Sequence, residues 1–299
     1  MKKIWWNELI DTKRTTIIHA VFFCTILILF VLCSKVFHIN AYEIYLGVSD
    51  WPASLKLPIA FLYKLEIPNA VRCLLLVQSA LNFPVLFYAA LLPAHIIGKE
   101  NENGMLMYVC NGPFSRKDIF YGKLLACCTN YAVVTAAMFF TGAIMTVWGM
   151  DFVSSFLICA RVYGMLLVMG MFLIYIFAFY CAVKNTYTHS RIRVFFCLLI
   201  NMAGGYCYLL AMTVIDVLEA RGTIVSLNQT FGFVLYILQQ FSAVHLCGPG
   251  EIYLKFPWLL VAALFSFIII IGTISGKIIE GKDFGRECTG TNAETINKD

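Results

Sequence analysis

Four polar side chains stand out because they interrupt long apolar runs of this sequence. Gln78 and Asn82 are four residues apart, so on a helix they share one face. Asn201 and Tyr208 are seven residues apart in a later run, beside Gly204-Gly205, which allows close approach of helices. Polar side chains at membrane depth are turned toward protein or water. These four therefore either contact a substrate or form hydrogen bonds between helices, and both interpretations stay open.

Signatures of catalysis are absent from the sequence, which has no GxxxxGK[ST] phosphate loop, no HExxH or GxSxG motif and no paired intramembrane aspartates. Its five histidines lie on separate segments, and none of its 12 cysteines forms a CxxC pair. We therefore expect a protein that is not an enzyme and binds no metal and no cofactor itself. Most cysteines are expected to be free, buried thiols. A disulfide between Cys73 and Cys247 is left open.

The composition indicates that lipid is the solvent for much of the chain. Of 299 residues, 61% are hydrophobic and 13% are charged, with a mean hydropathy of +0.81. A soluble domain carries about 45–50% apolar and about 25% charged residues. The net charge of +5 is modest and does not indicate nucleic acid as a partner. We therefore predict an all-α membrane protein surrounded by membrane lipids.

Six apolar runs are long enough to cross a hydrocarbon core of about 30 Å. None carries a charge in its middle third, as the cost of a charge in lipid demands. The predicted transmembrane helices are residues 16–37, 71–97, 124–148, 162–183, 194–215 and 257–276. We expect them to form a single transmembrane domain over residues 1–276, followed by a polar cytoplasmic tail at 277–299.

Two further segments are expected at the membrane surface. Residues 1–15 are basic and tryptophan-containing, which predicts an N-terminal interfacial helix. Residues 231–248 are too polar for a confident span, so we predict a helical segment before the last span that is either re-entrant or surface-lying. A seventh span at this position is the alternative, and it would place the C-terminus outside the cell.

The distribution of basic residues predicts the orientation of the chain. Fifteen of the 22 lysines and arginines fall in the N-terminus, the second and fourth connections and the tail, and the other seven lie elsewhere. Because cytoplasmic segments carry the excess of positive charge, both termini are predicted to be cytoplasmic. An even number of spans agrees with this orientation. The expected location is the cell (plasma) membrane.

The second connection, between the spans 71–97 and 124–148, has the most informative pattern. It begins with acidic residues, continues as a short amphipathic piece and ends at a glycine-proline break that no helix continues through. These features lie at Glu100, Glu102, Met105, Leu106, Val109 and Gly112-Pro113.

A new helix is expected directly after this break. Ser115 is placed to cap a helix that begins at Arg116 and carries Gly122-Lys123 into the third span. A short amphipathic helix held between two spans offers a rigid surface to a cytosolic partner. The alternative is an ordinary solvated loop.

The second connection resembles the signature of the type-2 ATP-binding-cassette (ABC) permeases. In that family a Glu-x-Gly-like segment leads to a hydrophobic pair, a Pro-x-Ser-Arg turn and Gly-Lys at the next span. The matching residues are Glu102-Asn103-Gly104, Met105-Leu106, Pro113-Phe114-Ser115-Arg116 and Gly122-Lys123. The six-span plan, the interfacial N-terminal helix and the elaborated connection before the sixth span are similar to the family too. Met105 departs from it, because the family more often has threonine after the glycine.

The resemblance implies a transport subunit without catalytic residues. ABC ATPase subunits would carry ATP and Mg, and a second permease copy or a homologous permease would complete the path. The implied ATPase-docking residues are Glu100, Glu102, Gly104, Met105, Leu106, Val109, Pro113 and Arg116. The second and fifth spans would line the substrate path, with Gln78, Asn82, Asn201 and Tyr208 as its polar residues.

The function expected from this resemblance is export. Aromatic outer loops and the lack of buried charge favour a hydrophobic or amphipathic peptide or drug as substrate, such as a peptide in antimicrobial self-immunity. One alternative is a non-transporting membrane sensor or assembly protein. Another is a membrane-embedded enzyme, which would need a convergent polar cluster that the sequence does not show.

Overall fold

The computed structural model describes residues 1–36, 68–98, 115–147, 151–183 and 257–281, together with a few isolated positions between 196 and 234. Its elements are α1 (Lys2–Val36), α4 (Asn69–Pro93), the π-helical turn η1 (Ala94–Gly98), α7 (Arg116–Val147), α8 (Phe152–Val183) and α13 (Trp258–Gly281). No strand occurs in these described stretches. The prediction of an all-α fold is confirmed for this part of the chain.

Five of these helices have the length and apolar character of membrane spans, at 24 to 35 residues each. The shortest, α13, is about 36 Å long at about 1.5 Å per residue, which exceeds the hydrocarbon thickness of about 30 Å. Helices long and apolar enough to cross a membrane are therefore confirmed, but a count of six is not. The predicted span 194–215 and the segment 231–248 lie almost entirely outside the described residues, as does most of the tail 277–299.

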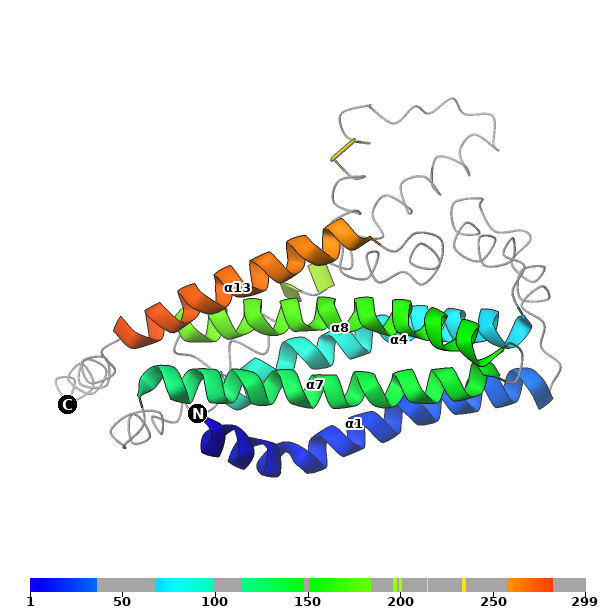
Figure 1. The fold of residues 1–299 in the computed structure, drawn as a ribbon, viewed down its shortest axis with the longest axis horizontal. Helices are drawn as coiled ribbons and strands as arrows, with labels where there is room; N and C mark the ends of the chain where they lie inside the picture. Colours follow the sequence, from blue (N-terminus) through cyan, green and yellow to red (C-terminus); the bar gives the residue numbers. More distant parts are fainter. Residues whose placement is uncertain are drawn as a thin grey trace, which may run out of the picture.

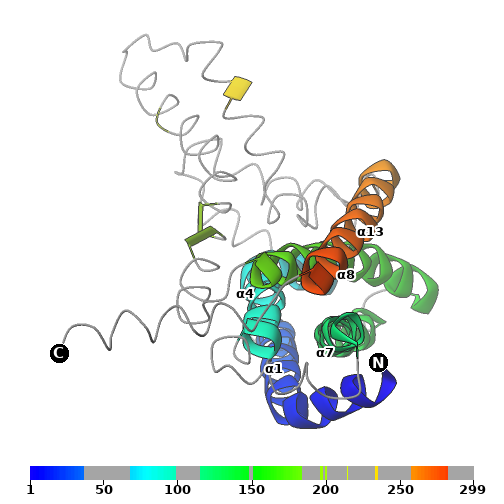
Figure 2. The ribbon, with the colours of Figure 1, turned by 90° about the vertical axis from the view of Figure 1, so that its left-hand side faces the viewer.

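The N-terminal region differs from the expected division into an interfacial helix and a separate span. Lys2–Val36 form one helix of 35 residues, and its ribbon bends between the first turns and the remainder (Figure 2). At about 1.5 Å per residue, α1 is about 52 Å long, far more than a hydrocarbon core. Its first turns pack on α7, where Trp5 Nε1 donates a hydrogen bond to Thr129 Oγ1 at 3.1 Å. The interfacial helix is thus not confirmed.

Side-chain caps explain why α7 and α8 begin before the predicted spans at 124 and 162. Ser115 Oγ accepts a hydrogen bond from the Asp118 N–H at 3.1 Å and donates one to Asp118 Oδ2 at 2.7 Å. The predicted N-cap is confirmed, and α7 runs through Lys123 without a break. Asp151 Oδ2 caps α8 by accepting from the Ser154 N–H at 2.9 Å. This hydrogen bond lowers the pKa of the Asp151 carboxyl, because it stabilises the charged form.

The five helices form an elongated bundle and run in two opposite directions (Figure 1). α1 and α7 run away from the end that holds the N-terminus, whereas α4, α8 and α13 run toward it. Lys117 near the start of α7 therefore forms an ion pair with Glu280 near the end of α13. α8 ends at the end of the bundle that holds the N-terminus, and α13 begins at the other end. The chain between them must therefore return along the length of the bundle.

Burial differs strongly among the helices. In the most apolar window of each helix, 61% of the residues of α4 are buried, against 22% in α1 and 28% in α13. The outward faces of α1 and α13 expose large apolar side chains, including Ile17, Phe22, Leu259 and Ile269. Such faces suit contact with acyl chains. Over its most apolar window, α4 is therefore the most buried of the five helices.

Tyrosine rings pack against glycines of a facing helix and set the distance between α7, α8 and α13. Tyr131 lies on Gly170, where an added Cβ would overlap the ring, and its hydroxyl donates to the Leu166 carbonyl at 2.8 Å. The same contact recurs for Tyr163 with Gly142, Tyr175 with Gly272 and Tyr121 with Gly276. Small residues let membrane helices approach closely, so these glycines are required by packing rather than by backbone conformation.

Glycine-to-alanine substitution at either of two positions of α8 tests this packing. Gly170→Ala should lower the thermal unfolding midpoint of the purified protein, because its Cβ overlaps the Tyr131 ring and overpacking typically costs about 1–3 kcal/mol. Gly164→Ala is the control, since nothing lies within 4 Å of its added Cβ. Equal midpoints for the two variants in detergent would contradict the tyrosine-glycine contact.

Candidate functional site

The two described residues of the predicted substrate path lie together on α4. Gln78 and Asn82 are each 1% exposed, and Gln78 Nε2 donates a hydrogen bond to Asn82 Oδ1 at 3.0 Å. Both are buried against helices of the same chain. Asn201 and Tyr208 lie outside the described residues, so whether the fifth span completes the path remains a prediction.

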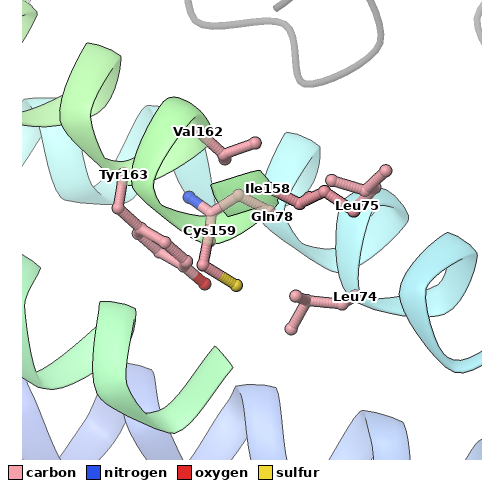
Figure 3. Close-up of a pocket in the computed structure, with 7 residues that line it drawn as sticks. All are labelled: Leu74, Leu75, Gln78, Ile158, Cys159, Val162 and Tyr163. Atoms are coloured by element: carbon pink, nitrogen blue, oxygen red, sulfur yellow. The ribbon is translucent and has the colours of Figure 1, made fainter. Parts of the chain in front are cut away.

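A small hollow between α4 and α8 lies beside Gln78. Figure 3 shows Gln78 extending from α4 toward α8, with Tyr163 and Cys159 extending from α8. The lining residues are Leu74, Leu75, Gln78, Ile158, Cys159, Val162 and Tyr163. The hollow has no room for a water molecule in this structure. A ligand would enter only if α4 and α8 separated.

Two polar atoms on residues that line the hollow have no hydrogen-bond partner in the described part of the chain. They are Gln78 Oε1 and the Tyr163 hydroxyl oxygen, and Tyr163 is only 2% exposed. A buried polar atom left unsatisfied costs about 1–3 kcal/mol, and native proteins contain few of them. Ser155 Oγ, two turns before Tyr163 on α8, is a third such atom.

Separation of α4 and α8 would expose hydrogen-bonding atoms among the apolar side chains of the hollow. Gln78 Oε1 accepts a hydrogen bond, whereas the Tyr163 hydroxyl can donate or accept one. Leucine, isoleucine and valine side chains and the Cys159 thiol supply the rest of the lining. The arrangement fits an amide or hydroxyl carried on an otherwise apolar molecule. Tyr163 was missed from the sequence, because a tyrosine within an apolar run gives no sign that its hydroxyl is unpaired.

A second polar cluster lies at the end of the bundle that holds the N-terminus. Lys123 Nζ lies 2.6 Å from Glu8 Oε1 and 3.4 Å from the Ile96 carbonyl oxygen. The side chains of Lys123 and Glu8 are 3% and 18% exposed. In the sequence Lys123 counted as a cytoplasmic positive charge and as part of the Gly122-Lys123 motif, with no ion-pair partner predicted. Its position at the edge of an apolar run was the one available signal of burial.

Further hydrogen bonds join α1 to its neighbours beyond this ion pair. Asn130 Nδ2 donates to Thr12 Oγ1 at 2.7 Å, and the Thr16 and Tyr88 hydroxyls lie 3.5 Å apart. Thr12 and Thr16 follow Glu8 at intervals of four residues, so the three side chains lie on the same face of α1. This face of α1 is thus bonded to α7 and α4 over several turns.

Among the predicted ATPase-docking residues, only Arg116 lies within the described part of the chain. It is half-buried in the first turn of α7, directly after the Ser115 cap. The others lie outside the described residues: Glu100, Glu102, Gly104, Met105, Leu106, Val109 and Pro113. Their docking role remains a prediction. Within the described stretches no three His, Cys, Asp or Glu side chains are grouped as metal ligands.

Comparison with known proteins adds no family to this picture. No protein-family model matches the chain, and no curated protein matches it. Over its described residues the fold is all-helical, with five helices long and apolar enough to cross a membrane. Its function is therefore argued from its own residues.

Two tyrosine-to-phenylalanine variants test whether the hollow holds an unsatisfied hydroxyl. Tyr131→Phe should lower the thermal midpoint, because it removes the bond to the Leu166 carbonyl and a hydrogen bond contributes about 0.5–1.5 kcal/mol. Tyr163→Phe should leave the midpoint unchanged or raise it, because the lost hydroxyl has no partner among the described residues. A loss for Tyr163→Phe as large as for Tyr131→Phe would mean that the Tyr163 hydroxyl is satisfied.

Proposed function

We propose that this chain is the membrane-spanning permease subunit of an ABC exporter. It lies in the plasma membrane with both termini cytoplasmic and forms the substrate path with a second permease. Separate ATPase subunits, which carry ATP and Mg, dock on residues 100–117 and drive transport. The observation that carries the proposal is the motif from Glu102 to Lys123, followed by an unbroken helix into the bundle.

The mechanical setting of the docking segment supports this role. Upstream it follows η1, the continuation of α4, and downstream it leads into α7 through the Ser115 cap. A force on the segment therefore acts on two packed helices at once. α4 is the helix that carries Gln78 and Asn82, so displacement of the segment reaches the proposed path directly.

The hollow supports a hydrophobic or amphipathic peptide or drug as the substrate. Its lining is mainly aliphatic, while Gln78 and Tyr163 offer hydrogen-bonding atoms that no described residue satisfies. Such a site binds apolar surface with one polar group, as a peptide amide provides. α4 contains Pro84 and Pro93 within the helix, and proline removes a helical hydrogen bond at which bending can occur.

Replacing the α4 amides tests the path. In cells that express the permease with its ATPase, Gln78→Leu or Asn82→Leu should change several-fold the minimum inhibitory concentrations of some members of a panel of hydrophobic drugs and amphipathic antimicrobial peptides. The complex should still assemble, because leucine fills a similar volume. Ser79→Leu is the control, since Ser79 is exposed on the same helix. Loss of assembly in the amide variants would instead assign Gln78 and Asn82 to packing.

Replacing the apolar docking residues tests the partner. The double variant Met105→Asp/Leu106→Asp should co-purify with about tenfold less candidate ATPase, because each charge would be buried without a partner at the interface. The spans should still insert. A matched control adds the same charge to the polar tail as Thr291→Asp/Asn292→Asp. Wild-type recovery of the ATPase and wild-type transport by the docking variant would show that the segment is an ordinary loop.

A further inference from the structure

The Lys123 ammonium group connects three helical elements, α1, η1 and α7. Its Nζ contacts Glu8 on α1 at 2.6 Å and the Ile96 carbonyl of η1 at 3.4 Å, and Lys123 itself belongs to α7. Lys123 is 2% exposed in this bundle of apolar helices. Ionisable side chains inside membrane proteins are expensive, and they generally face a partner and serve a function.

The place of these contacts along the chain is specific. Ile96 lies just before the connection 99–114, and Lys123 lies nine residues after its end. One ammonium group therefore fixes both ends of the connection to each other and to α1. Figure 2 looks onto this end of the bundle, where α1, α4 and α7 lie next to one another.

Stability alone is a weak explanation for a buried ion pair. Removal of water from both charges offsets much of their attraction, so apolar residues of similar volume often serve as well. Loss of one partner is costly, however, because it leaves an uncompensated buried charge. The chain also has an exposed pair for comparison: Lys117 and Glu280, with side chains 41% and 59% exposed. Exposed pairs contribute little.

We propose that Glu8 and Lys123 are positioning residues that clamp α1, η1 and α7 into one unit at the base of the connection 99–114. When the connection is displaced, the clamp makes the N-terminal turns of α1 move together with α4 and α7. Hydrogen bonds from Trp5 to Thr129 and from Asn130 to Thr12 hold the same face of α1 in register. The inference rests on the proposed docking role of that connection.

Amide hydrogen exchange of the full-length protein in lipid nanodiscs tests the clamp. The key variant is Glu8→Gln/Lys123→Met, which removes both charges and leaves none buried alone. Its thermal midpoint should stay near that of the wild type. Exchange should become about tenfold faster in residues 2–14 and 94–98 together, because these segments open locally once uncoupled, while α8 is unchanged.

Two comparisons separate coupling from general stability. Glu8→Gln alone should speed exchange in 94–98, although Glu8 lies on α1, whereas Lys117→Met should change neither segment. Wild-type exchange in the double variant would overturn the clamp, and so would a uniform increase in all helices with a lower thermal midpoint. The measurement needs no ATPase, so its failure removes the clamp without touching the docking proposal. Failure of ATPase co-purification leaves the exchange result standing.

Discussion

Helices in lipid gain little from the hydrophobic effect when they associate, because acyl chains are as apolar as the side chains they replace. Close packing and a few polar contacts remain, and both depend here on short distances between α7, α8 and α13. Gly170 lets the Tyr131 ring lie on α8, and only then does its hydroxyl reach the Leu166 carbonyl. Tyr163, which lines the hollow beside Gln78, itself rests on Gly142. The shape of the hollow between α4 and α8 therefore depends on these contacts.

Buried polar groups have partners in one region of the bundle, whereas in another some of their atoms lack a partner among the described residues. Toward the end that holds the N-terminus they are paired: Lys123 with Glu8 and the Ile96 carbonyl, and Asn130 with Thr12. In the hollow, Gln78 Oε1 and the Tyr163 hydroxyl have no partner among the described residues. Paired groups resist separation, whereas unpaired ones gain a hydrogen bond when a suitable molecule arrives. The N-terminal end of the bundle is therefore held by paired polar groups, whereas the hollow keeps two hydrogen-bonding atoms that no described residue satisfies.

Local sequence signals predicted the elements well. Apolar runs predicted the helices, and serine followed by Arg116 predicted the start of α7, because both depend on neighbouring residues. The continuity of α1 was not predicted from the basic composition of its first residues, which pack on α7 through the Trp5–Thr129 hydrogen bond. The sequence also did not predict the tyrosine-glycine contacts or the ion pair of Glu8 with Lys123. Their partners lie far apart in the chain, and only the register between helices brings them together.

The distance between Glu8 and Lys123 along the chain has a consequence for biosynthesis. The two residues are 115 positions apart, so at a synthesis rate of about 5–20 residues per second Lys123 is made about 6 to 23 s after Glu8. Throughout that interval the Glu8 carboxylate lacks the counter-charge that Lys123 provides in the folded protein. The start of α1 can reach its final place only after α7 has emerged from the ribosome. The contacts of α1 are therefore completed only once α7, which is made later, is in place.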